Sequence, residues 1–195
     1  MQPYLKPLVI GALLLVISAC TSQPSLPTAT DDLTPNAQLW HWQAQGRIAF
    51  ANNKNNHSAN LDWQQNGYNY QLQLFGPLGQ GSARLEGAPF KVILTTSDGK
   101  QVEASSPEQL LADNSDWELP LSNMLYWIRG IKAPGKHKEI NENSFLQHGW
   151  QVEWRRFSQV GEHQLPSLLI AEKGPLSFRL AINKWQIFST PSKEL

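Results

Sequence analysis

The chain has 195 residues, with 16 basic and 16 acidic side chains and a formal net charge of zero at pH 7. This balance argues against a nucleic-acid partner, which would require a basic stripe on the surface. A single cysteine excludes a disulfide within the chain, so stability must come from a hydrophobic core, and a domain of this length can build one.

The N-terminal segment has the features of a signal sequence that ends in a cysteine. Lys6 provides a short positive region, residues 8–17 are apolar, and the small residues Ser18 and Ala19 precede Cys20. This arrangement is similar to the lipobox of bacterial lipoproteins, and the resemblance implies cleavage before the cysteine and acyl chains attached to it. The apolar run is too short for a comfortable membrane span. An ordinary secretory signal with a chance cysteine is the alternative.

The segment after the cysteine is rich in Pro, Ser, Thr and Asp and cannot bury a core, so it is predicted to be a flexible tether. Thr21 follows the cysteine. In bacterial lipoproteins an Asp at that position marks retention in the inner membrane, so the resemblance implies the periplasmic face of the outer membrane. We divide the chain into a signal peptide (1–19), a lipidated cysteine with its tether (20–36), a folded domain (37–190) and a tail (191–195).

Alternating apolar and polar residues begin near Trp40 and predict strands with one wet and one dry face. The Asn66-Gly67 and Asp98-Gly99 pairs are strong signals for tight hairpin turns. Short connections between successive strands indicate an antiparallel meander. The strands of this first half are expected over residues 42–50, 58–64, 68–74, 80–87, 90–96 and 99–104.

The middle of the chain changes to a helical pattern. Ser106-Pro107 begins a short predicted helix that ends near Asp113, and a second helix is expected over 121–129, where Gly130 stops it. Strands are then expected near Leu146 and over 150–155, 168–170, 176–183 and 185–187. A long sheet curls because its twist accumulates. We therefore predict a mainly β fold with a helical insertion, in which a curved antiparallel sheet forms a half-open barrel covered by short α-helices.

The domain contains eight tryptophans, most of them at inward strand positions. Core packing explains any single one, but together such large, stiff rings can leave a cavity for an apolar ligand. Core and cavity positions have the same pattern in sequence. The candidate cavity residues are Phe50, Trp63, Tyr70, Leu72, Leu85, Trp127, Ile128, Trp150, Leu168 and Leu180.

The sequence carries no recognisable catalytic motif. None of the five histidines has a partner at metal-binding spacing, and the glycine-rich run 76–81 lacks the Lys-Ser/Thr ending of a phosphate loop. We therefore predict no catalytic residue, no metal and no cofactor other than the acyl chains on Cys20. The same run is of interest as a turn, because Pro77 and Gly79 flank Leu78. The leucine is either exposed at a projecting tip or folded back on the sheet.

Together these motifs resemble the LolB family of outer-membrane lipoprotein receptors. The resemblance covers residues 40 to 187 and rests on the order and spacing of several short motifs. They are the lipobox, Gly46-Arg47-Ile48-Ala49, Leu61-Asp62-Trp63-Gln64-Gln65, Gly76-Pro77-Leu78-Gly79, Ser106-Pro107-Glu108-Gln109-Leu110-Leu111, Leu119-Pro120-Leu121, Trp127-Ile128-Arg129-Gly130, Gly149-Trp150 and Ile182-Asn183-Lys184-Trp185.

The resemblance implies a monomeric receptor that takes acylated lipoproteins from a LolA-like periplasmic carrier into an apolar cavity. It also implies that Leu78, with Pro77 and Gly79, forms a membrane-insertion loop that delivers this cargo to the inner leaflet of the outer membrane without nucleotide. Two other functions stay open from the residues: a structural or assembly lipoprotein that binds another envelope protein, and a lipid-modifying enzyme.

Overall fold

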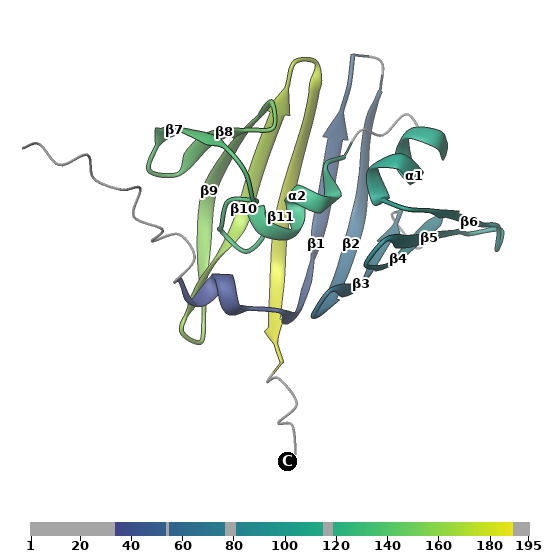
Figure 1. The fold of residues 1–195 in the computed structure, drawn as a ribbon, viewed down its shortest axis with the longest axis horizontal. Coiled ribbons are helices and arrows are strands. Elements are labelled where there is room, and N and C mark those ends of the chain that lie inside the picture. The colour runs from purple at the N-terminus through teal and green to yellow at the C-terminus, as the bar shows by residue number, and fades with distance from the viewer. Residues whose placement is uncertain (1–33, 54, 77–80, 115–118, 189–195) are drawn as a thin grey trace, which may run out of the picture.

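The computed structural model describes residues 34–53, 55–76, 81–114 and 119–188. Within these ranges the chain forms strands, then two helices, then strands again (Figure 1). The elements are η2 (Pro35–Gln38), β1 (His41–Ala51), β2 (Asn56–Asn66), β3 (Asn69–Phe75), β4 (Ser82–Ala88), β5 (Lys91–Thr96), β6 (Gln101–Ala104), α1 (Pro107–Asn114), α2 (Leu121–Trp127), β7 (His137–Asn141), β8 (Ser144–Gln147), β9 (Trp150–Val160), β10 (His163–Lys173) and β11 (Leu176–Ile187).

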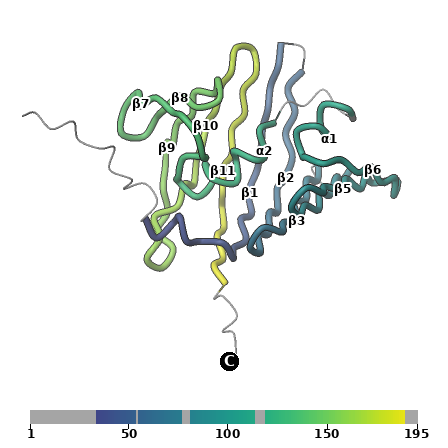
Figure 2. Tube along the Cα trace, viewed as in Figure 1, coloured from purple at the N-terminus to yellow at the C-terminus, as the bar shows by residue number. Residues whose placement is uncertain are grey.

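All strands of the described residues belong to one antiparallel sheet in the order β6-β5-β4-β3-β2-β1-β11-β10-β9-β8-β7. The first and last strands of the chain therefore pair in the middle of the sheet, and β6 and β7 form its two edges. The sheet curls so that β3 to β6 turn away from the plane of β9 to β11, while α1 and α2 cross its concave face (Figures 1 and 2). The predicted fold class is confirmed.

Glycine is required where β1 pairs with β11. We call the pairing of these two strands the seam, and its register shifts between Gln45 and Gly46, which marks a β-bulge. A Cβ atom on Gly46 would lie 2.0 Å from the carbonyl oxygen of Ala181, so no larger residue fits without moving the backbone. The extra residue of the bulge is Asn183 in β11, and a bulge bends the strand that carries it.

The core lies between the concave face and the helices, and aromatic rings run through it. Trp42 contacts Trp63 and Trp185, with ring centroids 5.5 and 5.4 Å apart. Across the seam, Trp127 from α2 stacks on Phe178 at 6.5 Å. These contacts anchor α2 over β11, and Trp42, Trp63 and Trp127 pack against other aromatic rings.

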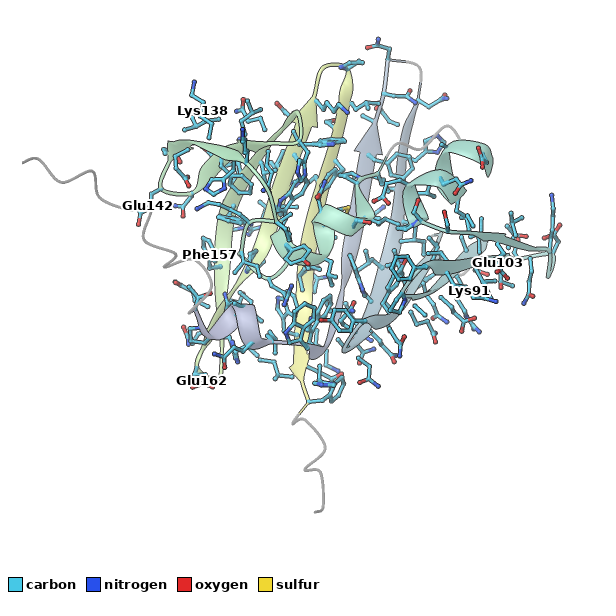
Figure 3. All side chains as sticks on the ribbon, viewed as in Figure 1. Lys91, Glu103, Lys138, Glu142, Phe157 and Glu162 are labelled. Atoms are coloured by element: carbon cyan, nitrogen blue, oxygen red, sulfur yellow. The ribbon has the colours of Figure 1, made fainter. Side chains whose placement is uncertain are left out.

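The two edges of the sheet carry charges that discourage further strand pairing. At one edge Lys91 and Glu103 form an ion pair of 3.0 Å between β5 and β6, and both side chains are exposed. At the other edge β7 is exposed along its whole length, with Lys138 on the strand and Glu142 just after it (Figure 3).

The structure differs locally from the sequence-based expectations. Strand β7 has no alternating pattern because both of its faces are exposed, and it was not predicted. Helix α2 ends at Trp127 rather than at residue 129, and the left-handed Gly130 (φ 76°) follows the turn. A bulge near residue 168 breaks the alternation of β10, so Leu169 joins the core cluster and Leu168 does not.

Candidate functional site

The two helices form a lid whose parts are joined by one side chain. Glu108, in the first turn of α1, accepts hydrogen bonds from the backbone N–H of Ser122 (2.7 Å) and from its hydroxyl (3.0 Å). Pro120 precedes α2 and provides no side-chain cap. The carboxylate therefore satisfies an orphan donor at the start of α2 and places negative charge at the positive end of the helix.

The C-terminal end of α2 is fixed to the sheet by buried polar contacts. The indole N–H of Trp127 donates to Gln147 (2.9 Å), and the indole N–H of Trp154 donates to the Trp127 carbonyl (2.9 Å). Gln147 also donates to the Ala133 carbonyl (2.6 Å). Since these groups are buried, breaking them leaves unpaired donors and acceptors. Helix α2 is thus bonded to α1 at its N-terminal end and to the sheet at its C-terminal end.

Arg129, just after α2, is fully buried. Its Nε donates to the Leu125 carbonyl and its Nη1 to the Leu39 carbonyl, both at 3.0 Å. The guanidinium also lies over the Trp40 ring, 4.5 Å from the centroid. Burial lowers the pKa of Arg129 to about 10. The residue connects the end of the lid to the start of β1.

An apolar cavity of about 170 Å³ lies beneath the lid, and we call it the central cavity. Sheet residues form its floor and helix residues form its roof, so a ligand inside would contact hydrocarbon almost everywhere. The lining residues are Ile48, Leu61, Leu72, Leu74, Ala83, Leu85, Leu94, Thr96, Leu111, Leu119, Leu121 and Met124.

Two further cavities adjoin the central cavity, each of about 320 Å³. The first, which we call the Tyr70 cavity, shares Leu72 and Leu121 with it and opens beside Tyr68 and Phe90. These two rings are 74% and 93% exposed, so they form an apolar rim in contact with water.

The other adjoining cavity, which we call the loop cavity, shares Leu74, Ala83 and Thr96 with the central cavity. It is bordered by Gly76 and Gly81, which flank residues 77–80 and are joined by a 3.1 Å backbone hydrogen bond. The three cavities therefore form a row along the concave face.

The structure places the candidate cavity residues in different environments. Leu72 and Leu85 line the central cavity, Trp63, Tyr70 and Leu72 line the Tyr70 cavity, and Phe50 lines the loop cavity. The remaining candidates are buried but border none of the three. They are Trp127, Ile128, Trp150 and Leu180 in the core cluster, and Leu168 outside it.

Several lining residues were not among the candidates. Ile48, Leu61, Leu74 and Leu94 occupy the same strand face as the candidates that were named, so alternation alone could have found them. Met124 comes from the lid, where the sequence shows an apolar stripe but not the face that it covers. The lipidation residue Cys20 and the loop residues Pro77, Leu78 and Gly79 lie outside the described residues.

Within the part of the chain that the structure describes, no group of three or more His, Cys, Asp or Glu side chains could hold a metal ion. In the same part, no helix has the length and hydrophobicity needed to cross a bilayer.

Solved structures share this overall fold. A LolA superfamily protein from Nitrosomonas europaea matches with a TM-score of 0.51 and 10% identity, over 84% of this chain and 92% of that protein. A DUF1329 family protein from Desulfovibrio piger matches with a TM-score of 0.52 and 4% identity, over 80% and 89% of the two chains. At such identities the likeness concerns the fold alone, and the fold defines a class of half-open antiparallel barrels covered by short helices.

Sequence comparison narrows that class to one family. The profile described as "Outer membrane lipoprotein LolB" matches residues 40–185. The outer-membrane lipoprotein LolB of Alkalilimnicola ehrlichii is 37% identical over 92% of this chain and 96% of its own length. That of Chromohalobacter salexigens is 33% identical over 91% and 88%.

The chain belongs to the LolB family of outer-membrane lipoproteins. Membership confirms the resemblance stated from the sequence motifs, the predicted outer-membrane location and the assignment as a protein other than an enzyme. It does not favour the alternative of a structural or assembly lipoprotein.

Proposed function

We propose that this protein receives the acyl chains of lipoproteins from a LolA-like carrier and holds them in the row of cavities until they enter the outer membrane. The observation that carries the proposal is the central cavity, which is lined by hydrocarbon and covered by a lid. The family membership and the shared half-barrel fold support the same role.

The physical need for such a receptor follows from the cargo. Each buried CH₂ group contributes roughly 0.8 kcal/mol, so one long acyl chain in water is unfavourable by on the order of 10 kcal/mol. A cavity that binds the chains more tightly than the carrier does, and less tightly than a bilayer does, makes transfer downhill at both steps. No nucleotide is then required.

The lid must move for the cavity to fill. Ligand pockets commonly have volumes of about 300–1,000 Å³, whereas the central cavity has about 170 Å³. The central cavity is therefore smaller than a typical ligand pocket and must widen to hold a long acyl chain. We infer that incoming chains displace α1 and the N-terminal end of α2, since the C-terminal end is held by Trp127 and Gln147.

The membrane contacts of the proposal lie outside the described residues. We propose that Cys20 carries the acyl anchor and that a tether leads to the folded domain. Asn36 donates to the carbonyls of Arg129 and Gln164, so the described chain is already attached to the domain there. We also propose that Leu78 enters the bilayer, which is supported by the contact of Gly76 and Gly81 with the loop cavity.

A transfer assay tests this function directly. A LolA-like carrier loaded with radiolabelled triacylated lipoprotein is mixed with this protein, and the label is followed first to the receptor and then to liposomes. We expect label on the receptor before it reaches lipid, without added nucleotide. Liposome delivery at equal rates with and without the receptor would refute the proposal.

A further inference from the structure

Among the described residues, three buried side-chain polar atoms have no hydrogen-bond partner: Trp42 Nε1, Tyr70 Oη and Arg129 Nη2. Trp42 lies between other rings of the core, and Arg129 already donates to two carbonyls. Tyr70 is different, because its side chain lines the Tyr70 cavity, which belongs to the space that the proposed function fills with acyl chains.

The backbone is adapted to the position of this phenol. Tyr70 pairs with Gly87 on the neighbouring strand, and a Cβ atom on Gly87 would lie 2.0 Å from Cε1 and 2.6 Å from Oη of the tyrosine. The ring therefore lies flat on β4, in space that only a glycine leaves open. Pro107 and Leu121, the first residues of α1 and α2, line the same cavity as Tyr70.

Three serine hydroxyls of this cavity are already engaged. The hydroxyl of Ser122 donates to Glu108, that of Ser105 donates to Gln109, and that of Ser106 accepts from the backbone N–H of Gln109. The buried phenol of Tyr70 has no acceptor. Burial, and then the charge of Glu108, raise the pKa of Tyr70, so the phenol keeps its proton at physiological pH.

The order of groups along the cavities matches an acyl chain that enters with its methyl end first. Tyr68 and Phe90 form the rim, Tyr70 lies inside it, and Leu72 and Leu121 lead into the central cavity. A tail in the central cavity leaves the carbonyl at the head of the chain near the phenol. We propose that Tyr70 Oη donates a hydrogen bond to the amide or ester carbonyl of a bound acyl chain.

This proposal rests on the proposed function and adds a preference for one kind of head group. The charge of Glu108 contributes to the raised pKa of Tyr70, so this carboxylate acts electrostatically on groups at the phenol. A neutral amide or ester is therefore accepted, whereas the carboxylate of a free fatty acid is repelled. The site would distinguish acylated protein from unesterified fatty acid.

The test uses the whole mature chain, residues 20–195, with Cys20→Ala in every variant so that its own anchor cannot compete. Three probes are delivered from cyclodextrin: N-methylpalmitamide, palmitate, and octadecane, which matches the amide in length but has no hydrogen-bond acceptor. We expect the amide to bind more tightly than palmitate at pH 8. Tyr70→Phe should weaken amide binding about fivefold, as expected for one hydrogen bond, and leave octadecane binding unchanged.

The matched control is Tyr68→Phe, because its ring is exposed at the rim of the same cavity. Any change that it causes should be equal for the amide and for octadecane, because no hydrogen bond to the carbonyl is lost. A second readout is the infrared stretch of a ¹³C-labelled amide carbonyl, which should move to higher wavenumber in Tyr70→Phe only. In Tyr70→Phe, equal losses for amide and octadecane, or an unchanged carbonyl band, would overturn the Tyr70 proposal and leave the receptor function standing. Failure of the unsubstituted cavity to bind any probe would overturn both.

Discussion

At the scale of single residues, Tyr70 shows a conflict between stability and ligand binding. A buried hydroxyl without a partner destabilises a protein by about 1–3 kcal/mol relative to a bonded one. Phe in its place would keep the ring over Gly87 and remove the unpaired group. The presence of a phenol at this position is consistent with a role in the ligand-bound protein.

We therefore predict that Tyr70→Phe stabilises the ligand-free protein by about 1 kcal/mol, measured by urea unfolding at pH 8. The variant should also change the response to alkali. The pKa of Tyr70 is raised in the folded protein. Ionisation of this phenol therefore leaves the unfolding free energy unchanged below the ordinary pKa of 10.0 and lowers it as the pH rises above that value. The variant should lose less stability than the parent between pH 9 and pH 11. A lower unfolding free energy at pH 8 would contradict the idea.

Leu78 is the second residue with a predicted role. Leu78→Glu should leave folding and cargo acceptance intact, because the loop lies beyond the ends of β3 and β4. It should block delivery to liposomes, since a carboxylate is costly to bury in hydrocarbon. Leu78→Met is the matched control and should deliver normally. Normal delivery by the Glu variant would rule out insertion of this side chain.

At the scale of elements, the lid depends on a contact between two short helices. The N–H of Ser122 is bonded to Glu108, whereas the C-terminal end of α2 is fixed by buried indole contacts. Loss of the carboxylate should therefore loosen one end of the lid and leave the other in place.

We predict that Glu108→Ala costs about 1 kcal/mol of local stability, the typical cost of a lost helix cap. Amide hydrogen exchange at Ser122 should then be about fivefold faster, while exchange at Ile128 stays unchanged. Glu108→Gln, which keeps an acceptor without the charge, should give an intermediate rate. Uniform acceleration across α2 would show that the helix opens as one unit.

Among the elements, the strands were predicted most accurately where polar and apolar residues alternate between the solvent-facing and the core-facing side. Strands β1 to β3 and both hairpin glycines 67 and 99 were expected and are present. Strand β7 was missed because an exposed edge strand has no dry face to detect. The bulge in β10 was missed because two adjacent leucines, 168 and 169, fit either register.

The candidate site was harder to predict than the fold. Trp127 and Trp150 are large inward side chains, as expected, but they pack against Phe178 instead of lining the cavities. Which inward residues border empty space depends on how the lid sits on the sheet. That depends on contacts between distant parts of the chain, such as Glu108 with Ser122, which periodicity does not reveal.

At the scale of the whole molecule, the first and last strands of the described sheet meet at the close contact between Gly46 and Ala181. Gly46→Ala would place a methyl group 2.0 Å from the Ala181 carbonyl. We expect a loss of more than about 2 kcal/mol in unfolding free energy, since the backbone of a central strand must shift. Ala49→Gly in the same strand controls for altered flexibility and should cost only about 0.5–1 kcal/mol. A small effect of Gly46→Ala would show that the seam tolerates movement.

The pairing of β1 with β11 also bears on when the protein can fold. Strand β1 (residues 41–51) pairs with β2 on one side and with β11 (residues 176–187) on the other. The centre of the sheet is therefore completed only when β11 has emerged from the translocation pore. Contacts of such long sequence separation make folding slow. The newly exported polypeptide would therefore have no finished pocket, and no place for a stray lipid, until nearly all of it had reached the periplasm.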